Sequence, residues 1–91
     1  MIKVNNEVVF ANNEIEELVV ITRVGADSGD EGLYKLRGIA LSMWSLISQG
    51  ISRSDLHQEL GQQYEPYDKA QISEVNSFID DLVKKGFVDE V

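Results

Sequence analysis

The hydrophobic pattern of the chain changes its period near residue 38, and this change constrains the fold more than any other feature. Before it, short β-branched and alternating segments predict strands, and after it apolar residues recur at helical spacing. Strands followed by helices indicate an α+β domain and argue against a βαβ sheet. Because 91 residues suffice for one domain and are too few for two, we expect a single domain over residues 1–91.

Three strands are predicted in the first part of the chain. They cover Glu7–Ala11, Leu18–Val24 and Leu33–Arg37. The pair Asn12-Asn13 lies between the first two strands and suits a turn. In the third strand, alternation places Tyr34 and Leu36 on one face and Lys35 and Arg37 on the other.

Three helices are predicted in the second part. The first covers about residues 38–49 and is apolar on most sides, so we expect it to be buried, with Trp44 in the core. Ser52 and Asp68 are the predicted N-caps of the second and third helices, and a last extended piece is expected at Phe87-Val88. The helices are expected to end at glycines, namely Gly50, Gly61 and Gly86. A small antiparallel sheet followed by three short helices describes a winged helix-turn-helix-like domain.

Composition excludes several classes of function. Sixteen acidic residues against eight basic ones give a net charge of −8, which opposes binding to nucleic acid. The absence of cysteine removes disulfides, thiolate metal sites and cysteine nucleophiles. No signal peptide is recognisable, and the longest uninterrupted apolar run among the first residues, Leu18 to Ile21, is too short to span a membrane. We therefore expect a cytoplasmic protein without membrane contact.

The residues that suggest metal or acid–base chemistry do not form a complete site. The acidic loop Asp27–Gly32 begins like a calcium loop, but Gly38 stands where the bidentate glutamate is needed. His57 is the only histidine, and its place on an amphipathic helix predicts a surface position without a catalytic partner. We expect no catalytic residues, no metal and no cofactor, and therefore no enzyme.

Lys35 and Arg37 form a local basic face in an acidic protein. If their strand lies at the edge of the sheet, its free N–H and C=O groups are able to accept another strand. Cations on an edge strand also protect against such pairing. The residues alone leave both interpretations open.

From Leu33 onward, the chain resembles the PqqD-like family. The resemblance is carried by the segment 36–50 with Trp44 inside its helix, by 51–56, by Leu60 and Tyr64, and by the closing stretch 75–88. Arg37 departs from the pattern, because many members carry asparagine at that position.

The resemblance implies a winged helix-turn-helix with a three-stranded sheet ahead of three helices. It also implies the role of a recognition element that binds the leader segment of a ribosomally made precursor peptide. The peptide is delivered to a modifying enzyme, such as a radical S-adenosylmethionine enzyme or a leader protease. On this pattern the leader adds as a strand beside the third strand and rests against the third helix. The implied peptide-binding residues are Leu33, Tyr34, Lys35, Leu36, Arg37, Gln71, Glu74, Val75, Phe78, Asp81, Leu82 and Lys85.

The apolar residues of this set have two interpretations. Phe78 lies at the rim of the apolar arc of the third helix, which suits a groove wall, whereas Val75 and Leu82 lie further inward. Each is either part of a groove or part of the core. Main-chain pairing would supply affinity, pockets would select leader side chains, and Lys35 and Arg37 would attract acidic leader residues.

Other functions remain open. A winged-helix DNA-binding regulator fits the architecture but not the charge of the third helix, where Glu74, Asp80 and Asp81 outnumber Lys84 and Lys85. A structural partner subunit of an enzyme complex is a further alternative. An exposed third strand is also able to pair with a second copy of the chain, so a homodimer stays open.

Overall fold

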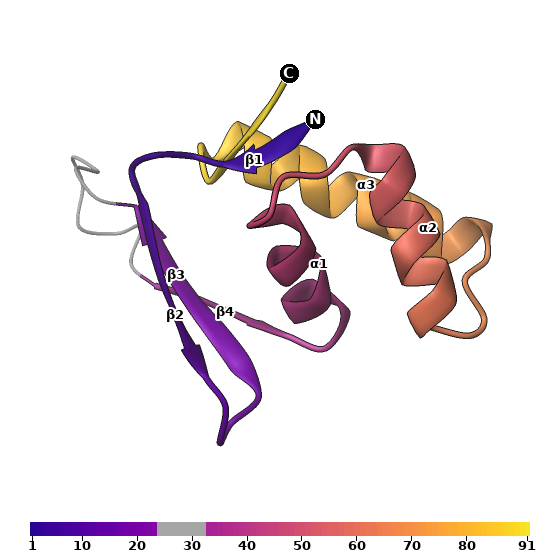
Figure 1. The fold of residues 1–91 in the computed structure, drawn as a ribbon, viewed down its shortest axis with the longest axis horizontal. Coiled ribbons are helices and arrows are strands. Elements are labelled where there is room, and N and C mark those ends of the chain that lie inside the picture. Colours follow the sequence, from indigo (N-terminus) through magenta and orange to yellow (C-terminus); the bar gives the residue numbers. More distant parts are fainter. Residues whose placement is uncertain (24–32) are drawn as a thin grey trace.

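The computed structural model describes residues 1–23 and 33–91 as five strands and three helices (Figure 1). The strands are β1 (Ile2–Val4), β2 (Val8–Asn13), β3 (Leu18–Arg23), β4 (Tyr34–Arg37) and β5 (Val88–Glu90). The helices are α1 (Ile39–Ile47), α2 (Arg53–Gln63) and α3 (Lys69–Lys84). The α+β class and the winged helix-turn-helix-like order of sheet and helices are confirmed. Val24 and the loop 25–32, including the calcium-like Asp27–Gly32, lie outside the described residues.

The main sheet is antiparallel, in the order β2-β3-β4. Burial alternates along β4, where Leu36 is buried and its neighbours Lys35 and Arg37 are exposed, as the sequence predicts. The predicted turn at Asn12-Asn13 is wrong, because both residues stay in β2 and the turn covers residues 14–17. The Asn13 side chain instead accepts a hydrogen bond from the N–H of Glu16, so it stabilises the turn from the strand end.

A second, two-stranded sheet joins the two ends of the chain, and the sequence did not predict it. β1 pairs antiparallel with β5, so that Ile2 lies opposite Glu90 and Val4 opposite Val88. Ile2 also exchanges two backbone hydrogen bonds with Ile51, at 2.7 and 3.1 Å, just before α2. The extended piece expected at Phe87-Val88 corresponds to β5, which begins at Val88.

The helix starts follow the predicted capping. The Ser52 side chain accepts a hydrogen bond from the N–H of Asp55, and Asp68 does the same for Gln71. The predicted end of α2 at Gly61 is wrong, since the helix continues to Gln63. Gly61 has no positive φ, and local composition alone made it resemble a helix end. By contrast, Gly86 takes φ +81° directly after the C-cap of α3.

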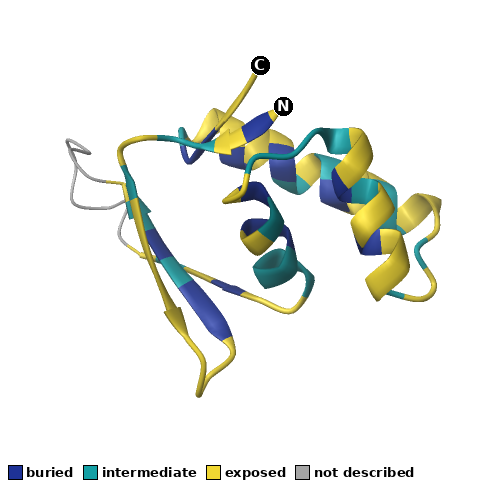
Figure 2. Ribbon diagram, viewed as in Figure 1, coloured by how far each residue is buried: buried dark blue, intermediate teal, exposed yellow. Residues whose placement is uncertain are grey.

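The core gathers around α1, which lies between the three-stranded sheet and the other two helices (Figure 1). Buried residues concentrate on β3, on α1 and on parts of α2 and α3, whereas β2 is almost entirely exposed (Figure 2). Trp44 is 2% exposed, which confirms its predicted place in the core, and Phe10 meets its indole edge-on at 5.5 Å. This packing fixes β4 against the start of α1 and leaves the other edge of β4 available.

Candidate functional site

β4 is an edge strand with two chemically different faces. It pairs with β3 on one side, and none of the described residues forms a strand on the other side. On its inner face, Leu36 is buried and Tyr34 is half-buried. On its outer face, Lys35 and Arg37 are exposed. An unpaired edge with free N–H and C=O groups is a surface on which an extended peptide can add as a strand.

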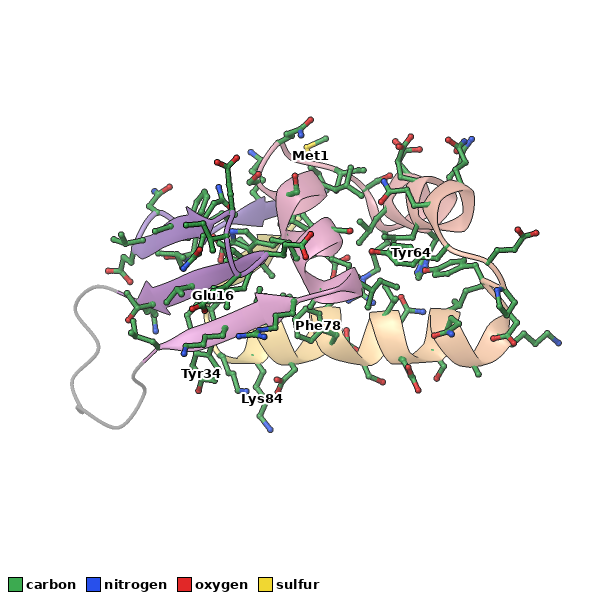
Figure 3. All side chains as sticks on the ribbon, turned by 90° about the horizontal axis from the view of Figure 1, so that it is seen from below. Met1, Glu16, Tyr34, Tyr64, Phe78 and Lys84 are labelled. Carbon is green, nitrogen blue, oxygen red and sulfur yellow. The ribbon has the colours of Figure 1, made fainter. Side chains whose placement is uncertain are left out.

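At its first residue, β4 reaches the last turn of α3. The Tyr34 ring meets Phe87 edge-on at 5.2 Å, and Lys85 Nζ lies 5.0 Å from the centre of the same ring. Lys85 also donates a hydrogen bond to Asp81 at 2.9 Å, which raises the pKa of Lys85 above its ordinary value. Figure 3 shows Tyr34, Phe78 and Lys84 along the side of the molecule where β4 overlies α3.

Beyond its last residue, β4 leads to an apolar pocket of about 190 Å³ between α1 and α3. We call it the α1–α3 pocket. Its walls are largely hydrocarbon, with Gln71 and Glu74 as the polar residues. The lining residues are Ile39, Ala40, Met43, Gln71, Glu74, Val75 and Phe78. Small-molecule sites usually measure roughly 300–1,000 Å³, so this volume suits a single side chain better than a complete small ligand.

The predicted site residues divide into four groups. Gln71, Glu74, Val75 and Phe78 line the α1–α3 pocket, and Tyr34, Asp81 and Lys85 meet at the other end of β4. Leu36 and Leu82 belong to the core, at 7% and 4% exposure, and Val75 is both core and pocket wall. Lys35, Arg37 and Leu33 are exposed, and Leu33 lies next to residues that are not described.

The contribution of α1 to this pocket was not predicted from the sequence. Ile39, Ala40 and Met43 form one wall of the pocket, whereas the predicted site comprises only the third strand and the third helix. A signal was present: the helix is apolar on more sides than a single contact needs, which is expected when it faces both a sheet and a pocket.

His57 differs from its predicted surface position. The His57 side chain is half-buried. Its Nδ1 shares a hydrogen bond of 2.5 Å with the Tyr67 hydroxyl, and its Nε2 lies 2.9 Å from Asn76 Oδ1. Arg53 donates to the same amide oxygen at 3.2 Å. These bonds connect α2 to α3 through polar side chains, so His57 has a structural place away from the α1–α3 pocket.

The residues that the structure describes, 1–23 and 33–91, contain neither a cluster of metal-ligating side chains nor a membrane-spanning helix. In that part of the chain, no three His, Asp or Glu side chains come together as a metal site. None of its helices has the length and apolar character needed to cross a membrane.

The edge strand β4, the helix α3 beside it and the α1–α3 pocket belong to a winged-helix-like domain. Comparisons with known proteins identify its family. The family model described as coenzyme PQQ synthesis protein D (PqqD) matches residues 23–88. The chain belongs to the PqqD family, as its resemblance predicted.

A solved structure shares the fold over nearly the full length. It is described as TbiB1 in complex with the TbiA(beta) leader peptide, and it superposes with a TM-score of 0.80 at 17% sequence identity. The match covers 98% of this chain and 96% of that one. A comparison with curated protein sequences gave no match.

Proposed function

We propose that the chain is a non-catalytic adaptor that binds the leader segment of a ribosomally made precursor peptide and presents it to a peptide-modifying enzyme. The observation that carries the proposal is the unpaired edge of β4, which runs from the end of α3 to the α1–α3 pocket. Membership in the PqqD family supports it, as does the leader peptide bound by the structurally similar TbiB1.

The proposed binding mode is strand addition. The leader extends the sheet to the order β2-β3-β4-leader, and its backbone uses the free N–H and C=O groups of β4. These bonds give affinity without selecting a sequence. Selection comes from side chains that enter the α1–α3 pocket, where Phe78 is half-buried and available for contact.

The proposed enzyme partner is a radical S-adenosylmethionine enzyme or a leader protease. Either would act on the part of the precursor that extends beyond the groove. A surface other than the β4 edge must then contact the enzyme, because the leader occupies that edge. The exposed strand β2 is the opposite edge of the same sheet and leaves room for such a contact.

The first test is an amide spectrum of the ¹⁵N-labelled protein, recorded with a leader peptide from a precursor encoded beside this chain. We expect shifts in residues 33–37 of the β4 segment, in Ile39 to Met43 and along α3. Duplex DNA is titrated in parallel. Salt-sensitive shifts of α3 with DNA, and none with the leader, would replace the adaptor by a winged-helix regulator.

The second test removes one side chain of the pocket. Phe78→Ala is expected to weaken leader binding at least about tenfold, since a half-buried aromatic ring in a pocket is a typical anchor of an interface. The matched control is Val83→Ala, which also shortens an apolar residue of α3, but one that is exposed and lies outside the pocket. Equal affinities of the two variants, measured by calorimetry, would refute a role for the pocket.

A further inference from the structure

The two faces of β4 predict what a bound peptide must look like. Neighbouring strands of a sheet place the side chains of paired residues on the same face. A peptide beside β4 therefore sends alternate side chains toward the face of Tyr34 and Leu36 and toward the face of Lys35 and Arg37. The inner face leads to hydrocarbon and the outer face to two cations.

The cations on the outer face are poorly compensated within the protein. On the neighbouring strand, Lys35 lies opposite Val20 and Arg37 lies opposite Leu18, so β3 supplies no carboxylate to either. In the described part of the chain, Lys35 has no ion pair. Arg37 has one, a contact of 3.8 Å to Glu16.

The Arg37–Glu16 pair is also weak. The two side chains are 62% and 55% exposed, and exposed pairs at such distances contribute little because water screens them. Lys85 differs, because it is already engaged with Asp81 and with the ring of Tyr34. Lys35 and Arg37 are therefore the basic groups that an added strand would meet, on a molecule whose net charge of −8 repels acidic peptides elsewhere.

We infer that the peptide recognised at β4 alternates apolar and acidic residues over the stretch that pairs with the strand. This inference rests on the proposed function and specifies its ligand. The apolar residues face Tyr34 and Leu36, with one entering the α1–α3 pocket, and the acidic residues lie beside Lys35 and Arg37. A shift of one residue along β4 would exchange the two sets, so the alternation also excludes registers displaced by one residue.

The alternation is tested with two labelled synthetic peptides of the same composition. In the first, leucine and glutamate alternate over six positions between glycine-serine flanks. In the second, the three leucines precede the three glutamates. Fluorescence anisotropy is expected to show at least about fivefold tighter binding of the alternating peptide. Equal affinities, or no binding of the alternating peptide, would overturn the inference.

The placement of the charges is tested by exchanging them. Lys35→Glu is expected to weaken binding of the alternating peptide about threefold to fivefold, the scale of an exposed ion pair. A version of the peptide with lysine in place of glutamate should bind Lys35→Glu better than the unchanged protein. The control is Lys3→Glu, an exposed lysine on β1 that changes the net charge equally. If Lys3→Glu has the same effect as Lys35→Glu, overall charge acts and the inference is wrong.

The amide titration with the natural leader separates this inference from the proposed function. If that leader shifts β4 and α3 while the synthetic peptides show no preference, the adaptor role stands and the alternation does not. If neither the leader nor the synthetic peptides bind, both are rejected.

Discussion

At the scale of single residues, Arg53 makes more polar contacts than the other cations of the described structure. Its guanidinium donates to both carboxylate oxygens of Glu90, at 2.6 and 2.9 Å, to Asp80 at 2.6 Å and to Asn76 at 3.2 Å. These partners lie on β5 and α3, while Arg53 is the first residue of α2. The Arg53 side chain is 28% exposed, so water screens its bonds less than those of the other ion pairs.

Arg53→Met is therefore expected to lower the free energy of unfolding by about 2 kcal/mol, the scale of lost charge-assisted hydrogen bonds. Methionine keeps most of the apolar stem, so the change isolates the guanidinium. The control Arg37→Met removes an exposed pair and should cost under about 0.5 kcal/mol. Urea unfolding followed by the fluorescence of Trp44, the only tryptophan, measures both, and equal losses would contradict the prediction.

The same contact predicts a dependence of stability on pH. The hydrogen bond from Arg53 lowers the pKa of Glu90 below its ordinary value of 4.5. A carboxylate with a lowered pKa stabilises the folded state above its unfolded pKa, and this contribution disappears as the pH falls through the folded pKa. The unfolding free energy of Glu90→Gln should therefore lie below that of the unchanged protein at pH 7, and the gap should close below about pH 4.5. A gap that persists at low pH would show that the ionised carboxylate is not the cause.

At the scale of elements, the sequence predicts what local contacts decide. The N-caps Ser52 and Asp68 were predicted because a capping bond joins residues three positions apart. β1 was not predicted, because three residues become a strand only through pairing with β5 at the other end of the chain. The end of α2 was misplaced because glycine is permitted in a helix as well as after one, and only backbone conformation separates the two.

Two glycine substitutions test this distinction. Gly61 lies inside α2, and a Cβ there would meet a Tyr67 ring carbon at an ordinary 3.6 Å. Gly61→Ala should raise the free energy of unfolding by about 0.5–1 kcal/mol, since alanine favours a helix. Gly86 has φ +81° and a Cβ there would lie 3.0 Å from the Arg23 guanidinium, so Gly86→Ala should lower it by about 1 kcal/mol or more. Thermal unfolding of the two variants compares the signs, and a gain in both would contradict the assigned backbone.

At the scale of the whole molecule, the candidate site combines parts that the sequence predicts to different degrees. The strand and the third helix follow from the alternation at Tyr34–Arg37, from the periodicity of 71–85 and from the family resemblance. The wall formed by α1 depends on how two helices cross, which periodicity does not encode. Periodicity likewise gave no means of deciding whether Val75 and Leu82 were core or groove, because both need an apolar side chain. The structure places Val75 in both and Leu82 in the core.

The family match does not coincide with the unit that folds. It covers residues 23–88 and therefore omits β1, β2 and most of β3, yet Ile2, Val19 and Ile21 are each 0% exposed in the core. Removing one such side chain lowers the free energy of unfolding by about 2–4 kcal/mol. The whole free energy of unfolding of a domain is only about 5–15 kcal/mol. A fragment of residues 23–88 also loses the pairing of β4 with β3 and of β5 with β1.

We therefore expect the fragment 23–88 to be unfolded, although it contains all of the predicted peptide-binding residues. Far-ultraviolet circular dichroism should lack the cooperative thermal transition of the full chain, and Trp44 fluorescence should resemble that of the chain in urea. A chain without Met1 and Val91 is the control, because both residues are exposed and lie outside the core. Cooperative unfolding of the fragment would mean that β4 keeps its conformation without β3. The edge proposed to bind the leader would then not depend on the sheet behind it.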